Sequence, residues 1–98
     1  MFARTSVWTG TPEALDKWDA GVGTVRPFVA ALDGNAGAFF FIDRAAGRAL
    51  TLTLWETEAA AVASDQFAEQ SRARTVAATG VSLLERGQYE VVETSEPV

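Results

Sequence analysis

Two apolar runs separated by a short polar turn dominate the hydrophobic pattern of the chain. The first run covers Gly37–Asp43 and the second covers Arg48–Trp55, with a glycine in the connection. Aromatic and branched residues on both sides of such a turn predict a β-hairpin. The second run alternates aliphatic with polar or aromatic residues: Leu50, Leu52 and Leu54 against Thr51, Thr53 and Trp55. One face of this strand is therefore aliphatic, whereas the other carries hydroxyls and an indole.

The segment before the hairpin predicts a helix. Thr11 is placed as an N-cap, Pro12 occupies the first helical position, and Glu13 adds an acid to the first turn. Apolar residues then recur at intervals of three or four: Leu15, Trp18, Val22 and Val25. Pro27 is expected to end or kink this helix near its last apolar residue. The segment 27–32 can add a further turn before the glycine turn that leads to the hairpin.

A strand at the N-terminus and a helix after the hairpin extend the pattern. Met1–Thr9 alternates apolar and polar residues and favours a strand. Thr57 can cap a second helix that runs from Glu58 to about Ala78, with Gly80 just past its end. The expected apolar stripe of this helix consists mostly of small residues: Ala59, Val62, Ala63, Phe67, and then Ala73 with Val76 or Ala77.

A long final strand is expected from Val81 to Val92. Gly87 interrupts its alternation and suggests a bulge or a bend at that position. The acidic tail at 93–98 contains a proline and is expected to fray.

The order strand, helix, strand, strand, helix, strand predicts one α+β domain over residues 1–98 with a ferredoxin-like fold. In this βαββαβ arrangement, a four-stranded antiparallel sheet carries both helices on one face. The other face would be bare and apolar in either register, with Phe39 and Phe41 or with Phe40 and Ile42 exposed. A homodimer formed through this sheet face would cover the apolar patch.

The chain contains no histidine and no cysteine, and this absence says more about its possible chemistry than any motif in the sequence. It excludes disulfides, zinc sites built on thiolate or imidazole, haem held by a proximal histidine, and Ser-His or Cys-His nucleophiles. No set of carboxylates has the spacing of a metal-ligand motif. We therefore expect neither a metal nor a cofactor.

Charge and hydropathy indicate which kinds of binding partner to expect. The chain has a net charge of −5, and its 8 basic residues are scattered, which argues against a surface that follows phosphates. No apolar run approaches the roughly 20 residues needed to cross a bilayer, and the N-terminus lacks the apolar core of a signal peptide. We expect a cytoplasmic protein that binds neither nucleic acid nor membrane.

From Leu52 to Ala59 the chain reads Leu-Thr-Leu-Trp-Glu-Thr-Glu-Ala. This run, the order of elements and the chain length resemble the dimeric α+β barrel superfamily, and within it the antibiotic biosynthesis monooxygenase-like domain. In that family a strand ends in Leu-Trp-Glu, and Ser/Thr-Glu-Glu/Ala begins the second helix. The resemblance implies a dimer and, in the quinone-forming members, a cavity between helices and sheet lined by aromatic and polar residues.

The superfamily also holds haem-degrading enzymes, muconolactone isomerases, chlorite dismutase-like proteins and stress-responsive domains, so the fold alone does not fix an activity. Its haem-degrading members use an Asn in the first strand with a Trp and a His on the second helix. The first strand here has no Asn, and Ser64 and Arg74 lie near where the Trp and the His would be. The resemblance therefore does not extend to haem degradation of that type.

Four residues are candidates for substrate binding. Trp18 and Phe40 offer aromatic faces, Trp55 offers an indole N–H, and Thr53 offers a hydroxyl to a quinone or phenol. Each also has a structural interpretation, because buried tryptophans usually pack in the core and threonine is a common strand residue. The sequence leaves both interpretations open.

Three residues are candidates for catalysis. Arg86 could stabilise an oxyanion, Tyr89 could donate its phenolic proton, and Asp65 could act as a base if an apolar pocket held it. The alternatives are a salt bridge, a solvated phenol and a surface acid, respectively.

Arg4 raises a separate question because it shares a face of the first strand with Ser6 and Trp8. A buried arginine is costly unless it is paired. We expect Arg4 to point to solvent near the sheet edge, or to pair with a carboxylate such as Glu85 or Glu90 of the final strand. The alternative is that Arg4 stabilises an oxyanion of the substrate.

These features support three hypotheses. The first is a cofactor-independent monooxygenase for a small aromatic or polycyclic phenol or quinol, in which the substrate carbanion itself reduces dioxygen. The second is a non-catalytic dimeric domain that binds a small hydrophobic ligand or belongs to a stress response. The third is an isomerase or lyase acting by proton transfer, which would need a buried Asp65 or Tyr89.

Overall fold

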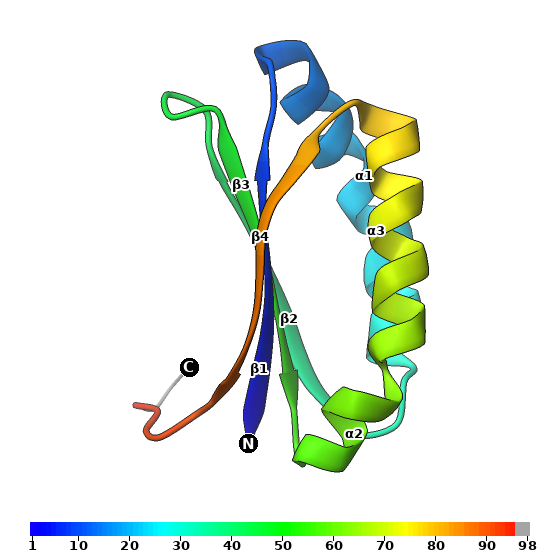
Figure 1. Cartoon of the computed structure of the whole chain (residues 1–98), viewed down its shortest axis with the longest axis vertical. Coiled ribbons are helices and arrows are strands. Elements are labelled where there is room, and N and C mark those ends of the chain that lie inside the picture. The colour runs from blue at the N-terminus through cyan, green and yellow to red at the C-terminus, as the bar shows by residue number, and fades with distance from the viewer. Residues whose placement is uncertain (96–98) are drawn as a thin grey trace.

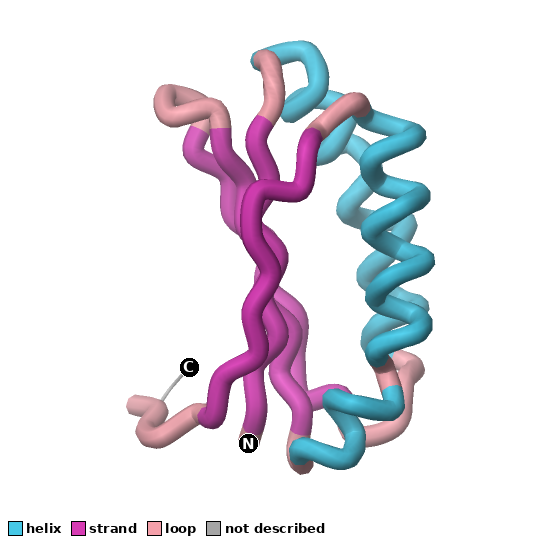
Figure 2. Tube along the Cα trace, viewed as in Figure 1, coloured by secondary structure: helices cyan, strands magenta, loops and turns pink. Residues whose placement is uncertain are grey.

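A computed structural model describes residues 1–95, which form one antiparallel sheet with helices on one side (Figure 1). The elements in chain order are β1 (Phe2–Thr9), α1 (Pro12–Ala30), β2 (Asn35–Asp43), β3 (Arg48–Trp55), α2 (Glu58–Ala63), α3 (Asp65–Thr79) and β4 (Ser82–Glu90). The strands lie in the order β2-β3-β1-β4. Figure 2 shows α1 and α3 side by side along one face of the sheet, with the other face uncovered by any helix. The ferredoxin-like fold predicted from the order of elements is confirmed.

The predicted helix boundaries are set by local capping. The Thr11 hydroxyl accepts a hydrogen bond from the backbone N–H of Ala14 at 3.2 Å, and Thr57 does the same for Ala60 at 3.1 Å. Gly80 ends α3 in the left-handed conformation, with φ of 84°. These bonds satisfy backbone groups that the first and last helical turns leave without partners.

Pro27 does not end the first helix near Val25, and the further helical turn expected over 27–32 is confirmed as far as Ala30. Helix α1 continues through Pro27 to Ala30. A proline inside a helix costs about 3 kcal/mol because it removes a hydrogen bond and crowds the preceding turn. Val29 is buried beyond the proline, so packing of the last turn against the domain offsets that cost.

The register of the sheet decides which residues face the helices. Thr51 of β3 lies opposite Ser6 of β1 and Phe40 of β2, and all of them line the space beneath the helices. The alternate residues point the other way, as the stacked rings of Phe39 and Phe41 show. The aliphatic face of β3 is therefore the outer face, and its threonines and tryptophan face the helices.

Strand β4 differs from the prediction in its irregularity and its length. The register between β1 and β4 shifts between Val7 and Trp8, where the β4 partner changes from Glu85 to Leu83, so the bulge falls at Leu84. Gly87 pairs regularly with β1, so the expected bulge is not at this position, and the bend expected there as the alternative stays a prediction. The strand ends at Glu90, and the expected fraying of the tail concerns positions that lie partly outside the described residues.

The expected apolar stripe of the second helix is also wrong. The helix is divided at Ser64 into α2 and α3, and Val62 and Val76 are 53% and 41% exposed. The residues of this segment that face the sheet are mostly small or hydroxylated: Ser64, Phe67, Ala68, Ser71, Thr75 and Ala78. Only Phe67 belongs to both sets. The break at Ser64 rotates the residues that follow it, so that a different set of side chains faces the sheet. This inward face borders a cavity and therefore does not have to be apolar.

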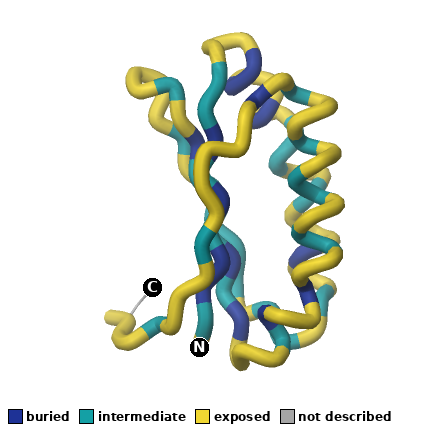
Figure 3. Tube along the Cα trace, in the orientation of Figure 1, coloured by how far each residue is buried: buried dark blue, intermediate teal, exposed yellow. Residues whose placement is uncertain are grey.

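Buried residues run along the sheet and lie at its two ends where it meets the helices, as the dark blue segments of Figure 3 show. The cluster at the start of α1 comprises Trp8, Ala14, Leu15, Trp18, Ala49 and Val81. At the other end, Trp55 and Ala61 are buried where β3 meets α2. The middle of the domain, between these two packed ends, is hollow.

Candidate functional site

A cavity of about 400 Å³ lies between the inner face of the sheet and helices α1 and α3. Its volume lies within the range of pockets that bury a small organic ligand, roughly 300 to 1,000 Å³. The four residues proposed from the sequence to bind substrate all line it: Trp18, Phe40, Thr53 and Trp55. The structure thus brings these side chains to one site, although their contact with a substrate stays a prediction.

Aromatic rings form part of the cavity wall. The rings of Trp18 and Phe40 lie with centroids 6.3 Å apart and planes tilted by 57°. This spacing is typical of a favourable aromatic pair, and it fixes both rings where α1 crosses β2. A planar aromatic ligand entering the cavity would meet rigid apolar surfaces on this side.

Two hydroxyls complete the inner face of β3. The indole N–H of Trp55 donates to the Thr53 hydroxyl at 3.0 Å, and the indole N–H of Trp8 points to the Thr51 hydroxyl at 3.4 Å. Each threonine oxygen accepts from an indole, and its own O–H can still donate. The cavity therefore offers hydrogen-bond donors to a carbonyl or phenolate oxygen beside its aromatic walls.

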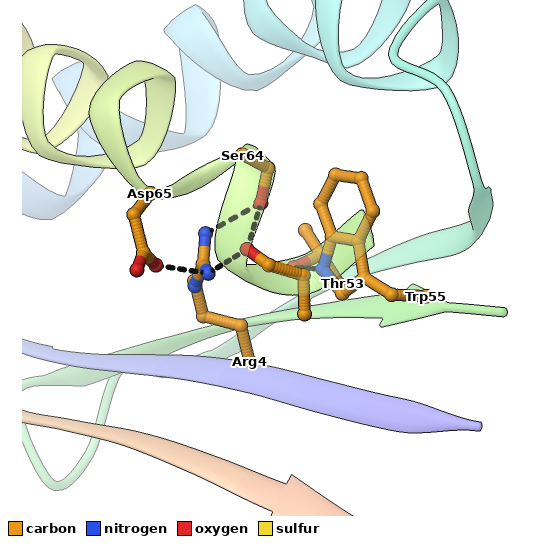
Figure 4. A network of polar contacts seen from close by, with 6 residues as sticks. Arg4, Thr53, Trp55, Ser64 and Asp65 are labelled. Carbon is orange, nitrogen blue, oxygen red and sulfur yellow. Dashed lines mark hydrogen bonds and ion pairs between the residues drawn. The ribbon is translucent and has the colours of Figure 1, made fainter. Parts of the chain in front are cut away.

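Arg4 is buried at one end of the cavity in a polar network (Figure 4). Its guanidinium donates to the Ser64 hydroxyl at 2.7 Å and also to the Ala61 carbonyl and the Asp65 carboxylate. The arginine side chain is 8% exposed, whereas that of Asp65 is 60% exposed. The pairing expected with Glu85 or Glu90 is wrong, because the partner comes from the start of α3.

The same network explains why the helix breaks at Ser64. In a continuous helix the Ala61 carbonyl would accept only the backbone N–H of Asp65. Here that carbonyl accepts from Arg4 and from both the hydroxyl and the backbone N–H of Ser64. Arg4 therefore competes for the acceptor that would have continued α2, and the chain starts a new helix at Asp65.

The three candidates for catalysis are not brought together. Tyr89 lies opposite Ala3 on the outer face of the sheet and is 54% exposed. Asp65 binds Arg4 with its carboxylate largely in solvent. Arg86 lies opposite Ser6 on the inner face, but it lines a polar recess beside the main cavity.

This polar recess has a volume of about 370 Å³ and lies between α3 and β4. It is lined by Arg4, Asp65, Glu69, Arg72, Arg86, Gly87 and Gln88. Burial lowers the pKa of the Arg72 guanidinium, and the neighbouring positive charges of Arg86 and Arg4 lower it further. Arg72 also lines the main cavity and so connects the two spaces.

Sequence reasoning missed Ser71, Arg72 and Thr75 as residues of the site. A second helical repeat that includes Phe67 runs through Ser64, Phe67, Ser71, Thr75 and Ala78, and this spacing could have identified the inward face. The repeat is easily overlooked because its hydroxyls resemble a solvent-exposed face.

Within residues 1–95, no group of histidine, cysteine or acidic side chains has the arrangement of a metal site. The same part of the chain contains no helix long and apolar enough to cross a membrane.

Comparison with solved structures shows where this architecture occurs. The chain superposes over its whole length on a candidate antibiotic biosynthesis monooxygenase from Deinococcus radiodurans, with a TM-score of 0.76, 14% identity and 99% of that chain covered. It matches SnoaB, a cofactor-independent oxygenase from Streptomyces nogalater, with a TM-score of 0.69 and 16% identity over 99% of this chain and 97% of that one.

A third match is a monooxygenase from the gene ActVA-Orf6 of Streptomyces coelicolor, solved with the ligand nanaomycin D. Its TM-score is 0.72 at 14% identity, with 99% of this chain and 92% of that chain covered. No model of a known protein family matches the sequence, and the search of curated proteins found no match either. The chain therefore has the fold of antibiotic biosynthesis monooxygenase-like proteins, as expected from the sequence, and at these identities the likeness shows the fold alone.

Proposed function

We propose that this protein is a cofactor-independent monooxygenase that oxidises a small aromatic or polycyclic phenol or quinol. The observation that carries the proposal is the cavity beneath the helices, with Trp18 and Phe40 on its wall and threonine hydroxyls on its floor. The fold shared with SnoaB and the ActVA-Orf6 monooxygenase supports the same class of reaction.

An anthrone illustrates the chemistry. The methylene carbon across the central ring from the carbonyl loses a proton to solvent, and the resulting enolate transfers an electron to dioxygen. The resulting radical pair combines to a peroxide, and loss of water from the protonated peroxide leaves a second carbonyl. One anthrone and one dioxygen thus give one anthraquinone and one water, and the substrate supplies all the electrons.

In this reaction the protein would hold the substrate in place and stabilise the negative charge of the enolate. The aromatic walls hold the ring system and keep water away from the enolate. The Thr51 and Thr53 hydroxyls can donate to its oxygen. Arg4 presents a positive charge to the same cavity, and the structure gives acceptors for only part of its five N–H donors.

A non-catalytic binding protein is the second candidate. Every titratable side chain that lines the main cavity is an arginine, namely Arg4, Arg72 or Arg74, so among residues 1–95 the cavity wall contains no carboxylate that could act as a base. A domain that only carries or senses a small hydrophobic ligand, including one of a stress response, would need the same apolar cavity and no base. The isomerase or lyase hypothesis loses its basis, because Asp65 and Tyr89 are both exposed.

The proposal includes a homodimer formed through the outer face of the sheet. This face, uncovered by any helix of the described chain, carries a continuous set of apolar residues: Ala3, Val7, Phe39, Phe41, Leu50, Leu52, Leu54 and Tyr89. A second copy of the same face would remove this surface from water and contribute roughly 25 cal/mol for each Å² buried. The cytoplasmic location expected from the sequence stays a prediction.

Oxygen consumption tests the proposed activity. Purified protein is mixed with anthrones, naphthols and hydroquinones, and uptake is followed with an oxygen electrode while tryptophan fluorescence reports binding. Ser71→Phe should abolish saturable uptake because it places a ring inside the cavity without removing a core residue. Ala73→Phe, on the exposed side of α3, is the matched control and should retain uptake.

The outcomes separate the two candidate functions. Saturable uptake that is lost only in Ser71→Phe supports the monooxygenase. Binding without uptake would refute the monooxygenase and favour a carrier or sensor.

A further inference from the structure

Three guanidinium groups converge beside the main cavity. Arg4 and Arg86 come from neighbouring strands β1 and β4, and Arg72 comes from α3 across the polar recess. Arg4 and Arg72 line both the recess and the main cavity, whereas Arg86 lines the recess. A ligand with its rings in the cavity could therefore extend a polar group toward this arginine cluster.

The charges of the recess are unevenly balanced. Its lining holds three arginines against the two carboxylates of Asp65 and Glu69, in a chain whose net charge is −5. Asp65 is engaged by Arg4. Within residues 1–95, neither Arg72 nor Arg86 forms an ion pair. Glu69 and Asp65 act on Arg72 as nearby negative charges that raise its pKa. A local positive charge thus stays without a counter-ion beside an apolar cavity.

We propose that Arg72 and Arg86 bind the carboxylate of an aromatic ligand whose rings occupy the main cavity. The proposal rests on the function proposed above and narrows its substrate to an aromatic carboxylic acid. The two residues lie on either side of the recess, on α3 and on the inner face of β4, so a carboxylate placed between them can receive N–H donors from both.

The arrangement favours a single negative charge. Three guanidinium groups and two carboxylates leave a surplus of one positive charge, which a carboxylate neutralises and a dianionic phosphate would exceed. Burial lowers the pKa of Arg72, the nearby positive charges of Arg86 and Arg4 lower it further, and the same monoanion would relieve that repulsion. Arg72 stays protonated at physiological pH because an arginine side chain does not lose its proton in proteins.

Binding of two matched probes tests the proposal without any turnover. Isothermal titration calorimetry compares 2-naphthoate with the neutral 2-naphthamide, which has the same rings and nearly the same shape. We expect the native protein to bind the acid about tenfold more tightly than the amide, as for a charge-assisted hydrogen bond that is partly open to solvent. Because the recess reaches the surface, this preference should fall when the salt concentration rises from 50 mM to 1 M.

Substitutions identify the residues that cause the preference for the acid over the amide. Arg72→Gln and, separately, Arg86→Gln should each reduce the preference for the acid severalfold while leaving the affinity for the amide nearly unchanged. Arg72→Lys should restore part of it, because it keeps the charge and loses the two-donor geometry. Arg26→Gln removes the same charge from an exposed position of α1 that lines neither space, and it should leave the preference intact.

The outcomes test the carboxylate subsite separately from ligand binding in the main cavity. Equal affinity for acid and amide, or an equal loss of preference in Arg26→Gln, overturns the carboxylate subsite and leaves the cavity as a binding site. If neither probe binds, the carboxylate subsite fails, and the oxygen-uptake assay with phenols and quinols decides the proposed function separately. A preference lost in Arg72→Gln and Arg86→Gln but kept in Arg26→Gln supports the subsite.

Discussion

Removing the carboxylate of Asp65 tests how the strand and the helix are joined. Asp65→Ala leaves the Arg4 guanidinium buried with two neutral acceptors and no counter-charge. Breaking a fully buried pair costs about 3 to 5 kcal/mol, whereas fully exposed pairs contribute about 0.2 to 1 kcal/mol. Here one partner is 8% and the other 60% exposed, so we expect a loss of about 1 to 2 kcal/mol in the free energy of unfolding.

Arg4→Met complements this change. It removes the buried charge and its hydrogen bonds, but the Ala61 carbonyl keeps the Ser64 hydroxyl and backbone N–H as donors. The double variant should therefore be less destabilised than the sum of the single variants, with a coupling energy of about 1 kcal/mol.

Urea unfolding followed by circular dichroism at a fixed protein concentration measures these differences, since a dimer would make stability depend on concentration. The control is Asp16→Ala, which removes a partner of Arg44 from a pair whose side chains are 51% and 68% exposed. That variant should lose no more than about 0.5 kcal/mol. The reasoning is refuted if Asp65→Ala is no more destabilising than Asp16→Ala.

Three other substitutions test separate parts of the structure. Gly34→Ala should cost about 2 kcal/mol or more, measured by urea unfolding, because φ is +77° and the added Cβ would lie 2.5 Å from an alanine Cβ of α2. Phe41→Glu on the outer face should convert the dimer to a monomer in sedimentation experiments, whereas Val62→Glu on α2 should not; a native protein that is monomeric at micromolar concentration would contradict the dimer. Thr53→Val leaves the buried indole N–H of Trp55 without its acceptor and should cost about 1 to 3 kcal/mol. An unchanged midpoint in Thr53→Val would show that the hydrogen bond contributes nothing.

Short-range signals in the sequence were sufficient for most of the fold. Thr11 and Thr57 determine where helices start, and Gly80 determines where one ends, because capping involves only neighbouring residues. The hairpin followed from its alternation and its turn. Once the order of elements was known, the handedness and adjacency rules left one plausible topology.

The faces of the elements were harder to predict. The alternation of β3 separates leucines from threonines but does not say which set faces the helices, and hydrophobicity alone suggests the leucines. The register with β1 and β2 places the leucines outside, where the proposed dimer would bury them. In α3, likewise, the alanine and valine stripe faces solvent and the hydroxyl stripe faces the cavity.

The sequence by itself determined the strands, the helix starts and the order of elements, since these depend on spacing along the chain. It offered Trp18, Phe40 and Trp55 as candidates without deciding which of them face a cavity. Only the tertiary structure decided that Arg4 pairs with Asp65, that Arg4 also donates to the Ala61 carbonyl where the helix breaks, and that Arg72 lies across from Arg86. These contacts join residues about 60 positions apart or on different elements. Their partners are selected by sheet register and helix phase, which emerge only when the whole domain packs.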